Sequence, residues 1–420
     1  MNTTPLSALP MSTEVTSKAD TCPSLVDFHG RDVATMNVKT PCRTQCGHGF
    51  YLDCLSNHFV GSRRCKMCQE DPMPVVNKIT GESYPVKFFP DEVFSSACYE
   101  GNLDRVEKSL AEGVNVNAVS TNDFTALMLA SFSGKKEVVE CLLNAGAEVN
   151  ARNINRATAL FIAADKGNTD CLQLLLDKGA DPNARDKNGA TPLSVAVMEN
   201  NVDCVKLLLD NGADIDTRNK AGETPLSLAI LMGNTDCVQL LLDRGPDIEA
   251  RNENGATALF CATLMGNTDC VQLLLSIGAE PDARNKNGVT PTAIAVQRNN
   301  IDCVKRLIKA GANVNSRTVH GITPLHFAAQ ENNIDIVKLL LENGADPDAR
   351  NENGETPLFF SAGKGNTDSV QLLLVKGADI DSRNKDGETP LVIANRMGNA
   401  DCARLLINAG ARQETEAMQE

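Results

Sequence analysis

The sequence predicts a mainly α-helical solenoid of stacked repeats, preceded by a small α+β domain that is rich in cysteine. Two observations carry this prediction. A 33-residue unit, seen clearly at 351–383, recurs in register over the last two thirds of the 420-residue chain. Six of the 15 cysteines gather instead within 47 residues near the N-terminus. A unit of this length holds two short helices and a turn, and only stacked copies bury a continuous core.

Composition and periodicity divide the chain into five segments: a disordered tail, a module rich in Cys and His, a linker or hairpin, the array of repeats, and a polar tail. In order, these are residues 1–20, 21–71, 72–90, 91–412 and 413–420. In the third segment, two apolar stretches flank a Thr80-Gly81-Glu82 turn, and this pattern is typical of a hairpin.

Each repeat carries start and stop signals for two helices. In the copy that opens at Thr356, the threonine hydroxyl can cap the first helix, and Pro357 suits its first position. A turn at Gly365 leads to a leucine-rich second helix, and Gly377 ends it. An extended stretch and a turn follow, which we call the finger. Openings of this kind recur every 33 residues, at Thr125, Thr158, Thr191, Thr224, Thr257, Thr290, Thr323, Thr356 and Thr389.

The Gly-x-Thr-Pro-Leu opening, the leucine-rich second helix and the Gly-Ala-Asp close resemble those of the ankyrin-repeat family. The copy at Thr323-Pro324-Leu325-His326 has the family's full tetrapeptide. The resemblance covers about residues 91–412, as nine full repeats after a degenerate N-terminal cap at about 91–119. It implies that the array binds a protein through the finger tips and the concave face of the first helices.

Three further features of the array recur with the repeat. Six cysteines share one second-helix position, which Ile336 and Ser369 fill in other copies, so core packing is favoured over redox sensing. An arginine closes each finger near Asp, Glu or Asn of the same loop, which favours local pairing over a grip on an acidic partner. His320 and His326 are expected to be finger and framework residues. The cysteines are Cys171, Cys204, Cys237, Cys270, Cys303 and Cys402, and the arginines are Arg152, Arg185, Arg218, Arg251, Arg284, Arg317, Arg350 and Arg383.

Apolar residues group at two first-helix positions that the resemblance assigns to the concave face. The group is bordered by polar residues in later copies, as in a protein-binding patch, and methionine adapts to varied partners. The alternative is that these side chains pack in the core. The predicted partner-binding residues are Met198, Leu231, Met232, Leu264 and Met265.

The N-terminal module contains two ligand pairs that predict a structural zinc site. Cys46 and His48 form the first pair, and Cys65 and Cys68 follow as the second. Three thiolates and one imidazole complete a tetrahedral set with no position open to water, which argues against a metalloenzyme.

The same module resembles the RING finger family, in which eight ligands hold two zinc ions. Cys22 and Cys54 lie at ligand positions of the second site, whereas Leu25 and Tyr51 replace its other two. Either Cys42, His29 or His58 completes this degenerate site, or apolar packing replaces the metal as in U-box domains. The dipeptide Cys22-Pro23 and the tripeptide Pro41-Cys42-Arg43 also look like the SP-RING module of SUMO ligases.

The RING resemblance implies recruitment of a charged ubiquitin or SUMO carrier enzyme without a covalent intermediate. Three positions depart from the family pattern: Ser24 replaces an apolar carrier contact, Lys66 replaces the proline between the last two cysteines, and Gln69 replaces a basic residue that helps orient the transferred protein. The sequence therefore predicts a protein-binding adaptor with ligase activity, or a non-catalytic scaffold whose zinc module is structural or a second docking site.

Charge and hydropathy restrict the location and the ligands. Residues 1–90 hold nine Lys and Arg against eight Asp and Glu, and the remainder holds 31 against 46. Such an acidic array repels phosphate, so we expect no nucleic acid partner. The chain has no long apolar stretch and no secretory signal at its start, so an intracellular, cytoplasmic protein without membrane contact is expected, with the nucleus or a host cell as other possible sites.

Overall fold

The computed structural model describes residues 92–120 and 123–412 in full, together with the backbone of four short strands between residues 41 and 84. The chain forms two compact units, residues 1–154 and 155–420. The predicted tails at 1–20 and 413–420 lie outside the described residues.

The first unit contains a four-stranded antiparallel sheet in the order β2-β1-β3-β4. Its strands are β1 (Pro41–Arg43), β2 (Gly49–Tyr51), β3 (Val75–Asn77) and β4 (Ser83–Tyr84). Strands β3 and β4 pair where the sequence predicts a hairpin, and the turn between them lies outside the described residues.

Two helix pairs follow in the same unit, namely α2 (Glu92–Glu100) with α3 (Leu103–Ala111), and α4 (Ala126–Phe132) with α5 (Lys136–Asn144). The first pair corresponds to the predicted degenerate cap. It lacks the threonine opening, yet Asn102 caps α3 by accepting a hydrogen bond from the backbone N–H of Arg105. The second pair opens on Thr125, whose hydroxyl caps α4.

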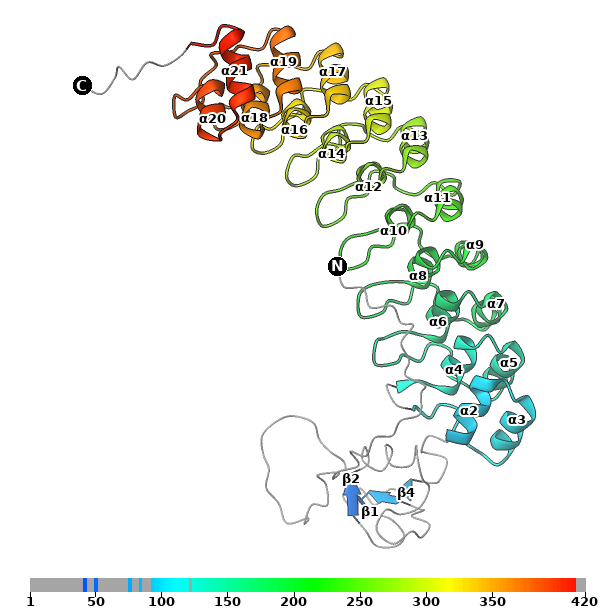
Figure 1. Cartoon of the computed structure of the whole chain (residues 1–420). Helices are drawn as coiled ribbons and strands as arrows, with labels where there is room; N and C mark the ends of the chain where they lie inside the picture. Colours follow the sequence, from blue (N-terminus) through cyan, green and yellow to red (C-terminus); the bar gives the residue numbers. More distant parts are fainter. Residues whose placement is uncertain are drawn as a thin grey trace. The chain divides into compact units, whose positions relative to one another are not determined.

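The second unit consists, in its described residues, of eight stacked helix pairs (Figure 1). The first helices lie between the fingers and the second helices, and the stack curves with the fingers on its inner side (Figure 1). The first helices are α6 (Ala159–Lys166), α8 (Pro192–Met198), α10 (Pro225–Met232), α12 (Ala258–Met265), α14 (Pro291–Gln297), α16 (Pro324–Gln330), α18 (Pro357–Lys364) and α20 (Pro390–Arg396). The second helices are α7 (Thr169–Asp177), α9 (Val202–Asp210), α11 (Thr235–Leu242), α13 (Thr268–Ser276), α15 (Ile301–Lys309), α17 (Ile334–Glu342), α19 (Thr367–Val375) and α21 (Ala400–Asn408).

The predicted helix signals act as expected. Every opening threonine lies at the N-cap of its first helix; at Thr191 and Thr224 a serine three residues later completes a reciprocal capping box. Glycines such as Gly212 and Gly377 follow the second helices with positive φ, where an L side chain would be strained. Local sequence therefore sets where most helices begin and end.

The core of the array is built from the facing sides of the helix pairs. In each leucine run of the second helices the middle leucine is buried, as at Leu208 and Leu274, and its neighbours are half-buried. The six periodic cysteines are buried as well, which confirms the core prediction for them. Burial raises the pKa of Cys237 and Cys303 to about 11, so these thiols stay protonated and weakly nucleophilic.

The fingers of the second unit are joined by a ladder of hydrogen bonds. A backbone N–H of each finger donates to a carbonyl of the finger before it, as from Lys187 to Asn155 at 2.9 Å and from Lys385 to Asn353 at 2.8 Å. An acidic or amide side chain adds a second bond, as when Asp216 accepts from the N–H of Asp247 at 2.9 Å.

Five finger arginines bind a carbonyl of the next finger, a partner that the sequence analysis did not predict. The predicted pairing within the loop also occurs, at Arg251, Arg350 and Arg383, which donate to a glycine carbonyl four residues later. Arg185 Nη1 donates to the Arg218 carbonyl at 2.8 Å, and Arg251 Nη1 donates to the Arg284 carbonyl at 2.5 Å. Arg218, Arg317 and Arg350 make the same contact with the arginine 33 residues later. A carbonyl one repeat away cannot be identified from sequence proximity, whereas nearby carboxylates can.

Candidate functional site

Five side chains from three adjacent first helices form what we call the apolar strip: Met198, Leu231, Met232, Leu264 and Met265. They belong to the last turns of α8, α10 and α12, which pack side by side in the stack. Met198, Leu231 and Leu264 are half-buried between neighbouring repeats. Met232 is 50% exposed and Met265 is 54% exposed. Core packing therefore explains the apolar character of the three half-buried residues. It does not explain the apolar character of the two exposed methionines.

Met232 and Met265 lie at the C-terminal ends of α10 and α12, at a repeat position that is exposed in the neighbouring copies as well. Gly233 and Gly266 follow these methionines in the left-handed conformation and accept the helix end without strain. Helices α10 and α12 are consequently one residue longer than α8 and α14, whose C-caps are Glu199 and Arg298. Two successive first helices, α10 and α12, therefore each end on an exposed methionine.

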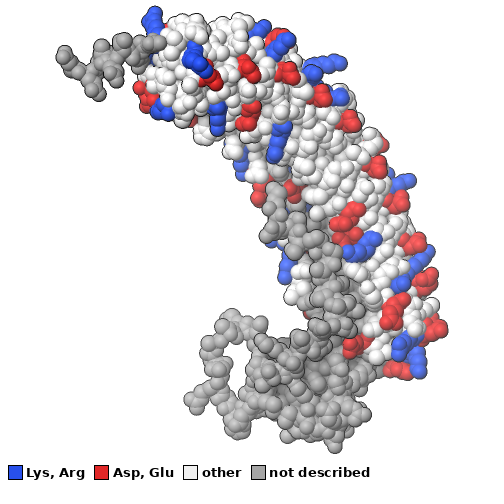
Figure 2. Space-filling view, in the orientation of Figure 1, with Lys and Arg blue, Asp and Glu red and all other residues white. Residues whose placement is uncertain are grey.

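Polar residues occupy the same position in the neighbouring repeats. Glu199 precedes the strip, and Arg298 and Glu331 follow it at 33-residue steps. All three side chains are exposed. In Figure 2, acidic and basic side chains are interspersed along the edge formed by the second helices, and neither sign forms a continuous patch there. The apolar strip is thus bordered by charge at both ends.

Met397 is an exposed residue that the sequence prediction did not include. It follows α20 at the position equivalent to Met232 and is 58% exposed. Three charged residues, Arg298, Glu331 and Lys364, separate it from the strip along this position of the repeat. The 33-residue spacing alone would have found it.

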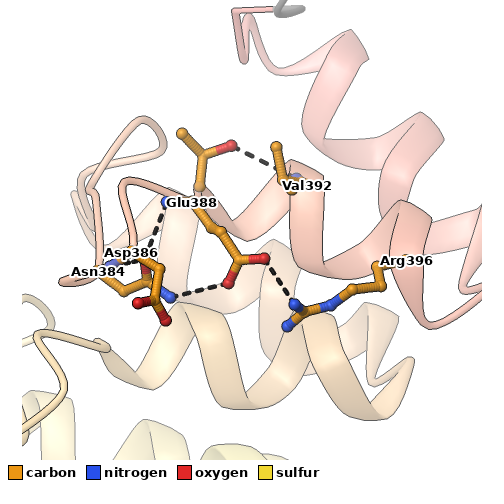
Figure 3. A network of polar contacts seen from close by, with 6 residues as sticks. Asn384, Asp386, Glu388, Val392 and Arg396 are labelled. Atoms are coloured by element: carbon orange, nitrogen blue, oxygen red, sulfur yellow. Dashed lines mark hydrogen bonds and ion pairs between the residues drawn. The ribbon is translucent and has the colours of Figure 1, made fainter.

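The last repeat uses its inner surface for internal contacts (Figure 3). The Glu388 carboxylate accepts from Asn384 Nδ2 at 3.0 Å and pairs with Arg396 at 2.6 Å. Arg396 occupies the position of Leu231, so here the equivalent side chain is held by an ion pair. This closes the loop onto α20 and makes the last repeat a poor candidate for the same docking mode.

The two histidines of the array behave as framework and finger residues. His326 is buried, with Nδ1 accepting from the Thr323 N–H at 3.1 Å and Nε2 donating to the Glu355 carbonyl at 3.1 Å. Burial lowers the pKa of His326 to about 4. His320 is exposed and lies 3.2 Å from the Glu352 carboxylate. Neither histidine belongs to a group of three or more potential metal ligands among the described side chains.

The predicted zinc ligands Cys46, His48, Cys65 and Cys68 lie outside the described residues, as do Cys22, Cys54 and His58 of the degenerate site. For Cys42 only the backbone, within β1, is described. Among the residues that the structure describes, no cluster of three or more His, Cys, Asp or Glu side chains could hold a metal ion.

The strand registers place the ends of three strands at the same end of the sheet. Arg43 pairs with Gly49 of β2 and with Val76 of β3, so the end of β1 and the starts of β2 and β3 coincide. In sequence, Cys46 and His48 lie in the five-residue connection from β1 to β2. Cys68 precedes the start of β3 by seven residues.

The comparison with protein families agrees with the fold. The family described as "Ankyrin repeats (3 copies)" matches the chain in overlapping blocks from residue 94 to residue 417. The match covers the helices of the described array and more than half of the chain. The chain therefore belongs to the ankyrin-repeat family, whose members bind other proteins. Its overlapping blocks are residues 94–186, 149–219, 184–252, 212–285, 269–351 and 325–417.

No curated protein matches the chain in a sequence search. Among the described helices, none has both the length and the apolar character needed to cross a lipid bilayer.

Proposed function

We propose that the chain captures a protein partner on the apolar strip of α8, α10 and α12. The observation that carries this proposal is the pair of exposed methionines, Met232 and Met265, on adjacent first helices. Exposed apolar groups that adjoin one another and are rimmed by charge are typical of protein-binding surfaces. Methionine also suits such a surface because its flexible, polarisable side chain adapts to the partner.

The test exploits a matched position elsewhere in the array. We expect Met232→Asp and Met265→Asp to weaken capture of the partner by about tenfold or more, because a charge would be buried at the centre of the interface. Met397→Asp is the control, since Met397 has the same place in the repeat and similar exposure but lies outside the strip. Partners are first captured from a cell extract with the wild-type chain and then titrated. Unchanged affinity of the Met232 variant, with the fold intact by circular dichroism, would contradict the proposal.

We further propose that residues 21–71 hold one structural zinc ion through Cys46, His48, Cys65 and Cys68, and that this module recruits a ubiquitin or SUMO carrier enzyme to the captured protein. Support comes from the ligand spacing and from the sheet registers. Cys46 and His48 lie in the connection from β1 to β2, and Cys68 precedes by seven residues the start of β3, which lies at the same end of the sheet. The alternative is a scaffold in which the zinc module is a structural element or a second docking site.

Counting the zinc ions per chain and assaying ubiquitin and SUMO transfer distinguish the ligase hypothesis from the scaffold hypothesis. We expect one zinc per chain, lost in Cys46→Ser and retained in Cys22→Ser if the degenerate site is metal-free. Chain formation is then assayed with a panel of ubiquitin and SUMO carriers. Zinc-loaded, folded protein that gives no product with any carrier would leave the scaffold as the function.

We propose a reducing compartment as the place of action. The nine cysteines that the structure describes are all unbridged, although the chain is rich in cysteine. Proteins of oxidising compartments use cysteine in disulfides more often than as buried thiols.

A further inference from the structure

The two charges that border the apolar strip have opposite signs and share one position of the repeat with the exposed methionines. In stack order this position holds Glu199, Met232, Met265 and Arg298, each 33 residues after the one before. All four side chains are exposed. Within the described residues, the Glu199 carboxylate and the Arg298 guanidinium make no hydrogen bond or ion pair. The row therefore presents an acid, two apolar groups and a base to a partner.

The spacing of the row selects the kind of partner segment. Packed helices lie about 10 Å apart, so the four side chains span about 30 Å. An α-helix rises 1.5 Å per residue and returns to nearly the same face after seven residues, a distance of about 10.5 Å. An extended strand returns to the same face every two residues, about 7 Å, and so falls out of step with the row. A helix of about 20 residues matches the row in both length and period.

We propose that the segment which occupies the strip is an amphipathic α-helix lying across α8, α10, α12 and α14. Two apolar side chains seven residues apart contact Met232 and Met265. A Lys or Arg one heptad beyond the first faces Glu199, and an Asp or Glu one heptad beyond the second faces Arg298. This inference rests on the proposed function and adds the class and charge order of the partner. The apolar pair supplies most of the affinity, and the terminal charges select between partners.

Synthetic peptides provide the probe because the natural partner is not identified. Three helical peptides of 24 residues differ only at the two outer heptad positions, which carry Lys and Glu, Lys and Lys, or Glu and Glu; all have leucine at the two inner positions. Affinity for the full chain is measured by fluorescence anisotropy. We expect the Lys/Glu peptide to bind about three- to fivefold more tightly than either of the others at low salt. The differences should disappear at about 1 M salt because charges are screened there.

Two variants of the chain make the test independent of peptide direction. Glu199→Lys places a base at both ends of the strip, and we expect it to prefer the Glu/Glu peptide. Arg298→Glu places an acid at both ends, and we expect it to prefer the Lys/Lys peptide. Both residues are exposed, so folding should be preserved, which circular dichroism checks.

Several outcomes would overturn the inference. Equal affinity of the three peptides, or an order that both variants leave unchanged, would show that the charges do not select. Failure of all three to bind would exclude the helical partner, whereas the capture experiment with Met232→Asp decides the proposed function separately. Equal peptide affinity of the wild-type chain and Met232→Asp would place peptide binding outside the strip.

Discussion

His326 is a single residue whose charge state depends on where the fold puts it. Its ring lies in the core, and the Nδ1 lone pair accepts a hydrogen bond from the Thr323 N–H. Burial lowers the pKa of His326 to about 4, since the charged form would lose its hydration. A proton on Nδ1 would also convert this acceptor into a donor that faces the Thr323 N–H. The folded chain thus holds the neutral imidazole.

The first prediction concerns pH. Because the unfolded pKa is about 6.5 and the folded pKa is lower, the stabilisation is complete above pH 6.5 and is lost as pH falls toward 4. The loss amounts to about 3 kcal/mol at pH 4 and below. Urea unfolding at several pH values measures it. In His326→Ser the slope between pH 6.5 and pH 5 should be smaller, since serine forms the same capping box at Ser194 and Ser227 without titrating. Equal slopes for the two proteins would contradict the assignment.

The finger arginines illustrate how a side chain can join repeats through the backbone. Arg251 donates to the Arg284 carbonyl at 2.5 Å and to the Gly255 carbonyl at 3.1 Å. Arg284 has no hydrogen bond to the Arg317 carbonyl, although it occupies the same position one repeat later. The second prediction is that Arg251→Ala lowers the unfolding free energy by about 1 kcal/mol. Arg284→Ala, the matched control, should change it by a few tenths of a kcal/mol at most. Similar losses in both variants would show that charge, and not this contact, matters.

At the residue scale, the sequence predicted which side chains are buried better than it predicted their hydrogen-bond partners. The burial of the periodic cysteines followed from the apolar and small residues that replace them in other repeats. The carbonyl contacts of Arg185 and Arg251 could not be predicted, because they depend on the stacking distance between fingers. The sequence left Met232 open between core and surface, and the charged residues at the same position of other repeats, such as Glu199 and Arg298, were the signal for exposure.

At the scale of elements, helix α11 differs from the other second helices of its unit. It ends at Leu242, one residue earlier than its equivalents, and Pro246 stands where the other repeats have alanine. In those repeats the alanine N–H closes the helix end, as from Ala279 to the Leu274 carbonyl at 3.0 Å. Proline has no N–H, so this bond is missing at α11.

The helices of the repeat that contains α11 also make fewer hydrogen bonds to the helices of the next repeat than most other neighbouring pairs do. Asn201, Asn234, Asn366 and Asn399 each donate from Nδ2 to two carbonyls at the end of the preceding first helix. Asn267 instead accepts from the Cys270 N–H of its own helix, and Asn333 does the same with the Ile336 N–H. Within the described part of the chain, no polar contact joins α11 to α13. The finger ladder therefore provides the polar contacts of the junction between the two repeats that carry Met232 and Met265.

The third prediction follows from the missing bond. We expect the amides in the last turn of α11 to exchange with solvent faster than those of α9 and α13, measured by hydrogen exchange. Pro246→Ala should slow exchange in that turn by restoring the donor. Ala279→Pro, the matched reverse change, should accelerate exchange at the end of α13 and lower stability by about 1 kcal/mol or more. Uniform protection across the three helices in the wild-type chain would be inconsistent with this account.

The boundaries of the array elements were largely predictable from their own residues. Threonine caps, proline at the first helical position and glycine after the helices act locally, so their effect does not depend on distant contacts. The strand pairing β2-β1-β3 was not predicted, because three-residue strands carry too little periodicity to identify a register.

At the scale of the whole molecule, the second unit owes its stability to one kind of junction used repeatedly. The described repeats of this unit contact their neighbours through helix packing and the finger ladder, and five finger arginines add a bond to the next finger. Interspersed charges along the second-helix edge, visible in Figure 2, avoid a strong field of one sign there. The binding surface is consequently set by a few substitutions at fixed positions of a uniform scaffold, as at Met232 and Met265. The number of repeats was predictable from sequence, whereas the curvature follows from packing between repeats.

The fourth prediction tests this modular organisation. Removal of residues 323–355 deletes one complete repeat, α16 with α17, and joins two repeats whose contact surfaces are of the same type. We expect a folded protein with the same helical signal per residue and a denaturant m-value lower by roughly a tenth, in proportion to the buried surface lost. The apolar strip and its bordering charges, Glu199 and Arg298, lie outside the deletion, so partner capture should be retained. Removal of only 323–338, which cuts α17 and shifts the register, is the control and should unfold the repeats on both sides. Loss of folding after the 33-residue deletion would mean that the repeats depend on particular neighbours instead of on a common junction.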